Sequence, residues 1–213
     1  MKIVAIGAHP DDYELGAGMR LMHHVKRRDD VLGIICSYGE KAGDIEIRIA
    51  ESIKAAEFMG INDLFMLNFT DTKFPPFEII KDRLEEIISS INPALVYSHY
   101  PDDRHQDHRA VALATAIACR RVPSILTYRS PSTDFNSFHP HLFHIGSHDD
   151  FTKKQELLQI HQSQIERDHG ISLKQLMLDS RFYASVVNRY ANLPIYAEPF
   201  CANHLVLNYG EFI

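Results

Sequence analysis

The chain has 213 residues, with 22 Lys and Arg against 28 Asp and Glu, so its formal charge at pH 7 is −6. This negative balance argues against nucleic acid or an anionic membrane as the main partner. No apolar run approaches the roughly 20 residues that span a bilayer, and charges interrupt the first apolar run too early for a signal peptide.

Strand-like apolar runs alternate along the chain with longer segments of helical period. In chain order, we predict a strand at Lys2–Gly7, a helix at Glu14–Arg28, a strand at Val31–Ser37, a helix at Ile45–Met59, a strand at Leu64–Leu67, a helix at Phe77–Ile91, a strand at Ala94–Ser98, a helix at Asp107–Arg120, a strand at Ser124–Tyr128, a loop at Ser130–His141, helices at Asp149–Asp168 and Ser172–Asn188, and a last strand near His204–Asn208. This alternation predicts a Rossmann-like α/β fold, with a mostly parallel sheet and helices on both faces. Neither a repeat nor a linker interrupts the pattern, so we expect one domain over residues 1–213.

The cysteines are few, odd in number and far apart, at Cys36, Cys119 and Cys201. Such spacing predicts neither a disulfide framework nor a thiolate zinc site. We therefore expect a protein of the reducing cytoplasm.

Two of the predicted strands lead directly into loops rich in His and Asp. The first loop belongs to VAIGAHPDDYELGAG (Val4–Gly18), and the second is SHYPDDRHQDH (Ser98–His108). Ligands of open parallel sheets bind at the carboxyl ends of the strands, where the strand order reverses. We expect the two loops to meet at one edge of the sheet.

A divalent metal would make this crowding favourable, because its charge reverses the repulsion among the carboxylates. The first loop offers His9 and Asp12, and the second offers His105, Asp107 and His108. A His/Asp/His set with water in the remaining position is a common catalytic zinc site. A further Asp beside the metal could then act as a general base.

Other interpretations explain single residues. Asp11 and Asp12 suit the N-terminus of the following helix, and a lone loop histidine is usually exposed. Neither explains two matching loops at once. A nucleotide-binding turn would need G-x-G-x-x-G, and the acids here would repel a pyrophosphate. A non-catalytic metal-binding scaffold would need a closed ligand shell, whereas Asp11 and His105 are left over.

The motifs resemble those of the LmbE-like, or PIG-L, zinc-dependent N-deacetylases. The family's A-H-P-D-D-x-E-x-G and H-x-D-H signatures are similar to AHPDDYELG and HQDH in this chain. The resemblance continues in SYGEKAG (Ser37–Gly43), RIAESIKAAEFMG (Arg48–Gly60), NFTD (Asn68–Asp71), HQSQ (His161–Gln164) and YAEPF (Tyr196–Phe200).

This resemblance implies roles for particular residues. His9, Asp12 and His108 would be the zinc ligands. Asp11 would be the general base, and His105 would polarise the scissile carbonyl or stabilise the oxyanion. Either Asp11 or His105 would protonate the leaving amine.

The resemblance also implies the surrounding residues. Asp107 would orient a histidine, and Arg48 and Asp71 would bind sugar hydroxyls. Tyr196 is a candidate oxyanion donor. The competing tyrosines are Tyr183 and Tyr190.

The chain departs from the family pattern at two places. Met19 and Arg20 follow Gly18 where relatives have Gly and Thr, which changes the region beside the metal loop. Arg129 stands where many relatives have Glu. It either selects an anionic substrate or is a surface residue paired with Asp134 or Glu198.

The activity that the resemblance implies is removal of the N-acetyl group from an N-acetylglucosamine-type amino sugar, with release of acetate. The alternative within the family is an amidase acting on a thiol conjugate or an antibiotic intermediate. The ligand types accept Fe²⁺ as well as Zn²⁺. Family members often form trimers or hexamers, so association of copies into a homo-oligomer is a further implication.

Overall fold

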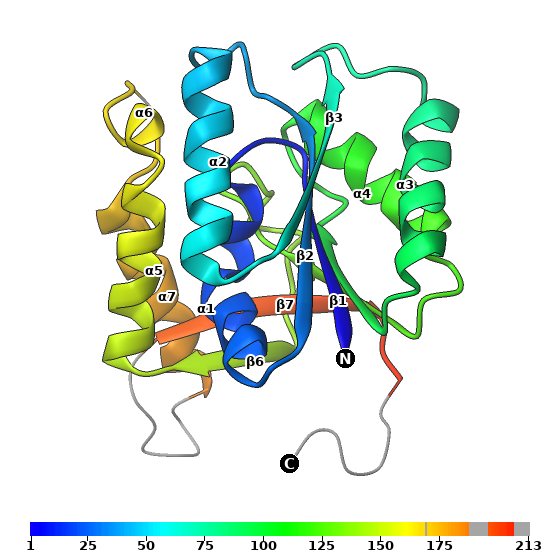
Figure 1. Ribbon diagram of the computed structural model, residues 1–213. Helices are drawn as coiled ribbons and strands as arrows, with labels where there is room; N and C mark the ends of the chain where they lie inside the picture. The colour runs from blue at the N-terminus through cyan, green and yellow to red at the C-terminus, as the bar shows by residue number, and fades with distance from the viewer. Residues whose placement is uncertain (169, 188–195, 207–213) are drawn as a thin grey trace.

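The fold is organised around one seven-stranded sheet (Figure 1). The structure is a computed structural model that describes residues 1–168, 170–187 and 196–206. Its strands are β1 (Lys2–Gly7), β2 (Asp30–Ser37), β3 (Asp63–Phe69), β4 (Leu95–His99), β5 (Ser124–Tyr128), β6 (Leu142–Gly146) and β7 (Tyr196–His204). Its helices are α1 (Asp12–Lys26), α2 (Ile45–Met59), α3 (Phe77–Ile91), α4 (Gln106–Ala118), α5 (His148–Gln159), α6 (Gln162–Ile165) and α7 (Leu173–Val187).

The strand order is β3-β2-β1-β4-β5-β7-β6. The first five strands in this order run parallel, and β7 pairs antiparallel with both β5 and β6. The predicted mostly parallel sheet is therefore confirmed. The chain leaves β1 toward β2 and later returns to β4 on the other side of β1. The carboxyl ends of β1 and β4 thus form the crevice where such sheets bind ligands.

Both faces of the sheet are covered, as predicted. Val4 and Ile6 of β1 pack in a core with residues of α3 and α4, whereas Ile3 and Ala5 pack with residues of α1 and α2. Figure 1 shows these two pairs of helices on opposite sides of the sheet. A parallel strand buried on both faces is apolar along its whole length, which is why Ile3–Ala8 carries no polar side chain. The first polar loop follows directly at the carboxyl end of this central strand.

From residue 2 to 128 the structure confirms the predicted strands and helices, with ends shifted by a few residues. The predicted helix at 149–168 is instead two helices, α5 and α6. The break has a physical cause, since the backbone N–H and the hydroxyl of Ser163 donate to the Glu51 carboxylate at 2.8 and 2.7 Å. Helix α7 matches the helix predicted at 172–188 as far as Val187, and Asn188 lies outside the described residues.

The prediction for the last strand was wrong. The strand is β7, so YAEPF lies within it rather than before it, and residues 207 and 208 lie outside the described part. Strand β6 was not predicted at all. Strand β7 is hard to recognise because Pro199, which lacks an N–H group, sits inside it, opposite Phe143 of β6.

Strand β7 also holds the first helix in place. The Glu198 carboxylate accepts hydrogen bonds from the backbone N–H groups of Met19 and Arg20, each at 2.8 Å. Lys154 of α5 pairs with the same carboxylate at 2.6 Å, and both side chains are buried. Met19 and Arg20, which depart from the family pattern, therefore contact β7 through their backbone N–H groups. This contact fixes α1, whose first turn carries Asp12.

Two further expectations concern membrane-spanning helices and disulfides. None of the described helices is both long and apolar enough to span a bilayer. The three cysteines are buried thiols that form no disulfide with one another.

His24, in the last turn of α1, is a buried histidine whose contacts suit the neutral ring. Its Nδ1 lies 2.8 Å from Asp29 Oδ2, and its Nε2 lies 2.9 Å from the Tyr97 hydroxyl. A neutral imidazole that donates through Nδ1 and accepts through Nε2 satisfies both contacts. Burial, helped by the nearby Arg20 charge, lowers the pKa of His24 to about 4.

We expect acid to destabilise the fold through His24. The unfolded chain binds this proton below pH 6.5, but the folded chain binds it only near pH 4, so stability falls as the pH drops through that window. Between pH 7.5 and pH 5 the loss amounts to about 2 kcal/mol. The His24→Gln variant should lose correspondingly less stability in urea unfolding at the two pH values. The exposed His139 provides the control, since His139→Gln should lose as much stability as the wild type. Equal losses in wild type and His24→Gln would contradict the assignment.

Candidate metal centre and active site

The turn after β1 is held in a tight, strained shape. The backbone N–H of His9 donates to Asp12 Oδ2 at 2.7 Å, which closes the turn. Asp11, between them, has φ of 86°, in the left-handed region that few non-glycine residues adopt. Arg48 of α2 braces the turn by donating to the Pro10 carbonyl at 2.9 Å. Strain of this kind is kept where surrounding contacts impose it, as at functional sites.

The second loop presents its histidines from the start of α4. His105 is the N-cap residue, and its Nδ1 accepts the backbone N–H of Asp107 at 3.3 Å. His108 follows in the first turn of the helix, so both rings face the same way. Their rings stack with centroids 4.6 Å apart.

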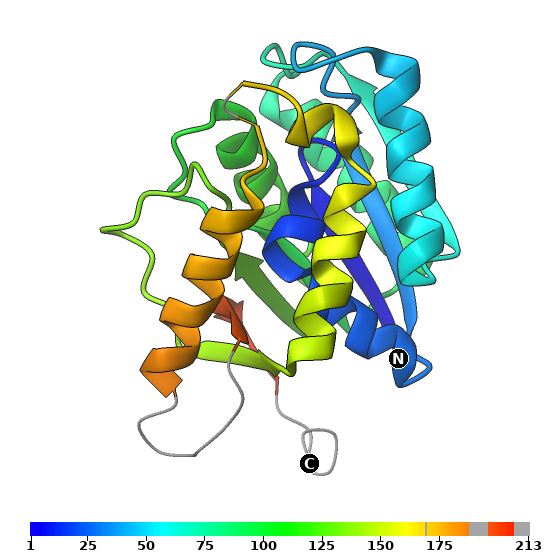
Figure 2. The same cartoon turned by 90° about the vertical axis from the view of Figure 1, so that its left-hand side faces the viewer.

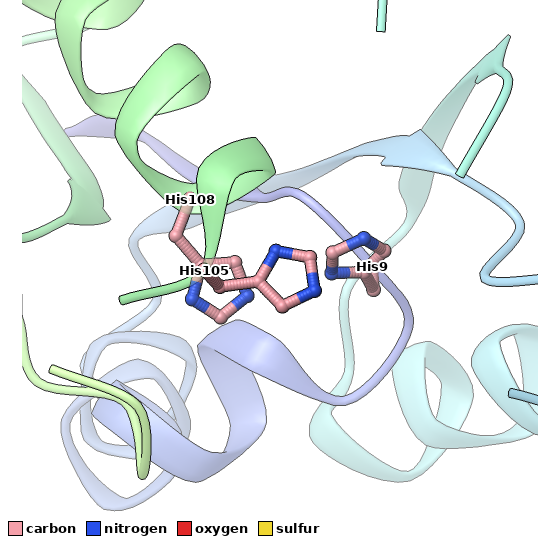
Figure 3. A group of neighbouring side chains, drawn as sticks. All are labelled: His9, His105 and His108. Carbon is pink, nitrogen blue, oxygen red and sulfur yellow. The ribbon is translucent and has the colours of Figure 1, made fainter. Parts of the chain in front are cut away.

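The structure brings the two loops together, as the strand order requires (Figure 3). The His9 ring, from the loop after β1, lies with its centroid 4.8 Å from that of His105 and 5.4 Å from that of His108. Asp12 lies between the two loops: Oδ2 is 3.5 Å from His9 Nδ1, and Oδ1 is 3.3 Å from His108 Nε2. Among the described residues, ligand atoms within 4.8 Å of one another form three groups that could hold a metal ion: His9, His105 and His108; His9, Asp71, His105 and Asp107; and Asp12, His99 and His108. The predicted ligands are divided between the first group, with His9 and His108, and the third, with Asp12 and His108.

The electrostatics of the cluster favour a cation. Burial alone would lower the pKa of His9, but hydrogen bonds to Asp107, Asp12 and Asp71 outweigh it and raise that pKa well above its ordinary value. His108 behaves alike: burial lowers its pKa, yet Asp12 and Asp103 bring it to about 9. Carboxylates that hold protons on buried imidazoles would also hold a dication, so the donor set fits a divalent metal.

Asp107 and Asp71 both contact His9. Its Nε2 lies 3.1 Å from Asp107 Oδ2 and 3.2 Å from Asp71 Oδ1. Asp107 Oδ2 also accepts the backbone N–H of Thr72 at 2.8 Å, and Asp71 Oδ2 accepts that of Lys41 at 3.0 Å. Both carboxylates are thus fixed by backbone donors and hold the His9 ring in place.

Asp11 differs from its neighbour Asp12 in its surroundings. Burial raises the pKa of Asp11 to about 6, although the Arg48 guanidinium opposes the shift. The guanidinium Nη2 lies 3.5 Å from Asp11 Oδ2. Burial would raise the pKa of Asp12, but the charges of His108 and His99, together with the hydrogen bonds to His108 and His9, outweigh it and lower that pKa well below the usual range. The surroundings therefore shift the pKa values of these two adjacent acids in opposite directions, which is typical of a general base beside a metal ligand.

Asp11, Asp12, His9 and His105 open onto a hollow of 150 Å³. Its other lining residues are Gly39, Ala42, Arg48, Asp71, Gln164 and Arg167. Gly39 has φ of 69°, and a Cβ there would lie 2.8 Å from the Arg48 guanidinium, so only glycine permits this approach. Predicted residues Arg48 and Asp71 thus share the hollow with the histidines. The HQSQ motif contributes Gln164 to it.

Two cluster residues were not predicted from the sequence. His99, fully buried at the end of β4, has its Nε2 3.1 Å from Asp12 Oδ2. Asp103 accepts hydrogen bonds from the hydroxyls of Ser132 and Thr133 and lies 3.3 Å from His108 Nδ1. Asp103 directly follows Asp102 in the sequence, and no local signal distinguishes the two acids.

Two predicted residues lie away from the cluster. Tyr196 stacks on Phe151 with ring centroids 4.1 Å apart, in a separate apolar cluster. Arg129 pairs with Asp179 at 2.7 Å, rather than with either acid considered from the sequence, and lines another pocket. Of the competing tyrosines, Tyr183 lines that same pocket, and Tyr190 lies outside the described residues.

The comparisons with known proteins agree on a family. The family model described as PIG-L, GlcNAc-PI de-N-acetylase, matches residues 4–119, more than half of the chain. The uncharacterized deacetylase YaiS of Escherichia coli strain K12 is 38% identical over 168 residues, which cover 76% of this chain and 90% of that protein.

Solved structures share the fold. N,N'-diacetylchitobiose deacetylase from Pyrococcus horikoshii superposes with a TM-score of 0.78 at 19% identity, covering 94% of this chain and 83% of that chain. GalB, the 4-carboxy-2-hydroxymuconate hydratase from Pseuodomonas putida KT2440, gives a TM-score of 0.77 at 16% identity, covering 97% and 98%. Because a hydratase shares it, the fold alone does not define the reaction. The family model and the deacetylase relative, together with the two His- and Asp-bearing loops, show that this chain belongs to the PIG-L family of deacetylases.

Proposed function

We propose that the protein is a zinc-dependent hydrolase that removes the N-acetyl group from an N-acetylglucosamine-type amino sugar or its conjugate. The observation that carries the proposal is the meeting of His9, Asp12 and His108 at the β1/β4 crevice, with Asp11 and His105 beside them. Three ligands leave a coordination position open for chemistry.

His9, Asp12 and His108 would hold the metal, for which zinc is the proposed ion and Fe²⁺ the alternative. When bound, such an ion lowers the pKa of water toward neutrality and polarises a carbonyl oxygen. Asp107 holds His9 in orientation through the contact at Nε2, as carboxylates behind metal-bound histidines do.

Asp11 is the proposed general base. With a pKa of about 6, its carboxylate is ionised at neutral pH and still basic enough to take a proton from the attacking water. His105 is the proposed donor to the developing oxyanion, a contribution of roughly 3–4 kcal/mol in the transition state. Either residue can return a proton to the leaving amine.

Arg48 and Asp71 are the proposed contacts to sugar hydroxyls. Both line the hollow beside the histidines. Among the described residues, Arg48 Nε and Nη1 have no hydrogen-bond partner although they are buried. Buried donors of this kind are costly unless a ligand satisfies them, and a hydroxyl oxygen is a suitable acceptor.

The test is a screen for acetate release. Purified protein with measured zinc content is incubated with a panel of N-acetylated sugars, with and without a chelator. We expect acetate from at least one sugar, loss of activity with chelator and recovery on adding zinc. Activity that survives complete zinc removal would refute the metal dependence. Cleavage confined to larger acyl or cysteinyl amides would instead indicate the amidase activity on a thiol conjugate or antibiotic intermediate.

Asp103 should tune metal affinity through His108. Replacing it with Asn removes the charge that faces His108 Nδ1, so we expect zinc affinity to fall by roughly 10- to 100-fold. Competition with a chromogenic chelator measures this change. The matched control is Asp102→Asn, a change at the exposed acid next to it, which should bind zinc like the wild type. Equal affinities in the two variants would remove Asp103 from the centre.

A further inference from the structure

A second pocket lies near the metal centre, at the carboxyl end of β5. It has a volume of 350 Å³, and its walls come from α1, α7, β7 and the residues that follow β5. Figure 2 shows α7 (orange) and α5 (yellow) flanking the start of α1 (blue). A cavity of about 150 Å³ accommodates benzene, and ligand pockets begin near 300 Å³. The pocket is therefore large enough for an aromatic ring or a short alkyl chain.

The pocket adjoins the proposed active site through shared structure. Ser130 lines it, and the Ser130 hydroxyl lies 3.3 Å from His108 Nδ1. Leu15 and Gly16 line it from the first turns of α1, directly after Asp12. The pocket and the hollow beside the histidines share no lining residue, so a substrate that occupies both would have to span Ser130 and the start of α1.

The lining indicates an uncharged, mainly apolar occupant. Its apolar residues are Leu15, Pro131, Leu176, Tyr183, Ala197 and Pro199. The charged side chains in its wall are already paired, Arg129 with Asp179 at 2.7 Å and Lys154 with Glu198 at 2.6 Å. An anionic ligand would have to compete with these carboxylates, so the pairing argues against the anion selection considered for Arg129.

One polar group of the wall has no partner among the described residues. Arg129 Nε is buried, and among the described residues no acceptor forms a hydrogen bond with it. The rest of the guanidinium is held by Asp179, which also receives Gln175 Nε2 at 2.8 Å. A fixed N–H group in an apolar wall suits one neutral oxygen acceptor, such as a carbonyl or ether.

We propose that this pocket binds an uncharged apolar group attached to the amino sugar, with an oxygen acceptor facing Arg129. The proposal rests on the proposed function, because it assigns the pocket to the part of the substrate beyond the acetylated sugar. The same chemistry can come from either side of the amide, as an aglycone on the sugar or as an acyl group larger than acetyl.

Binding is tested with ligands that the enzyme cannot hydrolyse. Calorimetry on the zinc-loaded protein compares phenyl with methyl β-D-glucopyranoside for the aglycone side, and benzenesulfonyl with methanesulfonyl glucosamine for the acyl side. Burial of a phenyl ring should give one phenyl ligand at least tenfold tighter binding than its methyl partner. No phenyl preference in either pair would overturn the proposal.

Two variants locate the binding. Leu176→Trp fills the pocket and should abolish the phenyl preference, whereas Leu178→Trp, at an exposed position of the same helix, should keep it. Arg129→Lys keeps a charge opposite Asp179 but removes the Nε–H group. A 4-acetylphenyl ligand should therefore gain affinity over phenyl in the wild type, and Arg129→Lys should remove that gain of about fivefold. A phenyl preference that persists in Leu176→Trp would place the ligand elsewhere and refute the assignment.

The readout is independent of turnover. A phenyl preference that Leu176→Trp abolishes supports the pocket even if the protein releases acetate from no sugar, and such a result would contradict only the proposed function. Acetate release without any phenyl preference would support the proposed function and contradict the assignment of the pocket.

Discussion

Replacing Asp11 with Asn should lower kcat by roughly 10²–10⁴-fold while leaving the zinc content of the protein unchanged, because the change removes a proton acceptor and no ligand. Asn is well suited to this test, since it tolerates the left-handed backbone that Asp11 adopts at φ of 86°. Rates of acetate release and elemental analysis of the same sample measure both quantities.

Asp44→Asn is a suitable control, since Asp44 caps α2 without lining the hollow, and Asn is also a favourable N-cap residue. That variant should retain the wild-type rate. Wild-type turnover in Asp11→Asn would exclude Asp11 as the base. Loss of zinc from Asp11→Asn would instead make it a ligand.

Replacing His108 with Ala should remove the metal. The variant deletes one of three proposed ligands and leaves Asp12 Oδ1 without the imidazole that lies 3.3 Å away. We expect purified His108→Ala to contain little zinc after dialysis and to release no measurable acetate. Elemental analysis of the dialysed protein gives the occupancy.

An exposed histidine controls for general effects of losing an imidazole. His139→Ala, in the loop before β6, should keep both zinc and activity. Full zinc occupancy in His108→Ala would contradict its assignment as a ligand and turn attention to the group formed by His9, Asp71, His105 and Asp107.

The parallel half of the sheet and its two loops could be predicted from the sequence because each signal there is local. An apolar run such as Ile3–Ala8 indicates a strand buried on both faces, and the acids and histidines that follow it stand out against that run. His9 and His108 belong to separate loops. The rule that ligands bind at the carboxyl ends of the strands, where the strand order reverses, was enough to predict that they meet.

His99 and Asp103 lacked such local signals. His99 stands alone at the end of an apolar strand, where a single histidine is most often a satisfied core residue. Asp103 follows Asp102, and nothing in their order separates the acid that faces His108 from the exposed one. Which of two adjacent acids points inward depends on the path of the loop, here set by the hydroxyls of Ser132 and Thr133.

The positions of Arg129 and Tyr196 depend on contacts between distant parts of the chain. Arg129 meets Asp179, 50 residues later, and Tyr196 stacks on Phe151. Local patterns carry no information about such pairs. The strand that contains Tyr196 was itself misplaced because a proline interrupts its pattern.

The position of β7 between β5 and β6 has a consequence for synthesis on the ribosome. The parallel strands β1 to β5 can pair as soon as they emerge, but one edge of β5 then stays bare until β7 has been translated. Glu198, whose carboxylate accepts hydrogen bonds from Met19 and Arg20 of α1, is also synthesised only with β7. A nascent chain that stalls before β7 therefore exposes an edge strand that can pair with other chains. Aggregation during synthesis should be greatest at this stage.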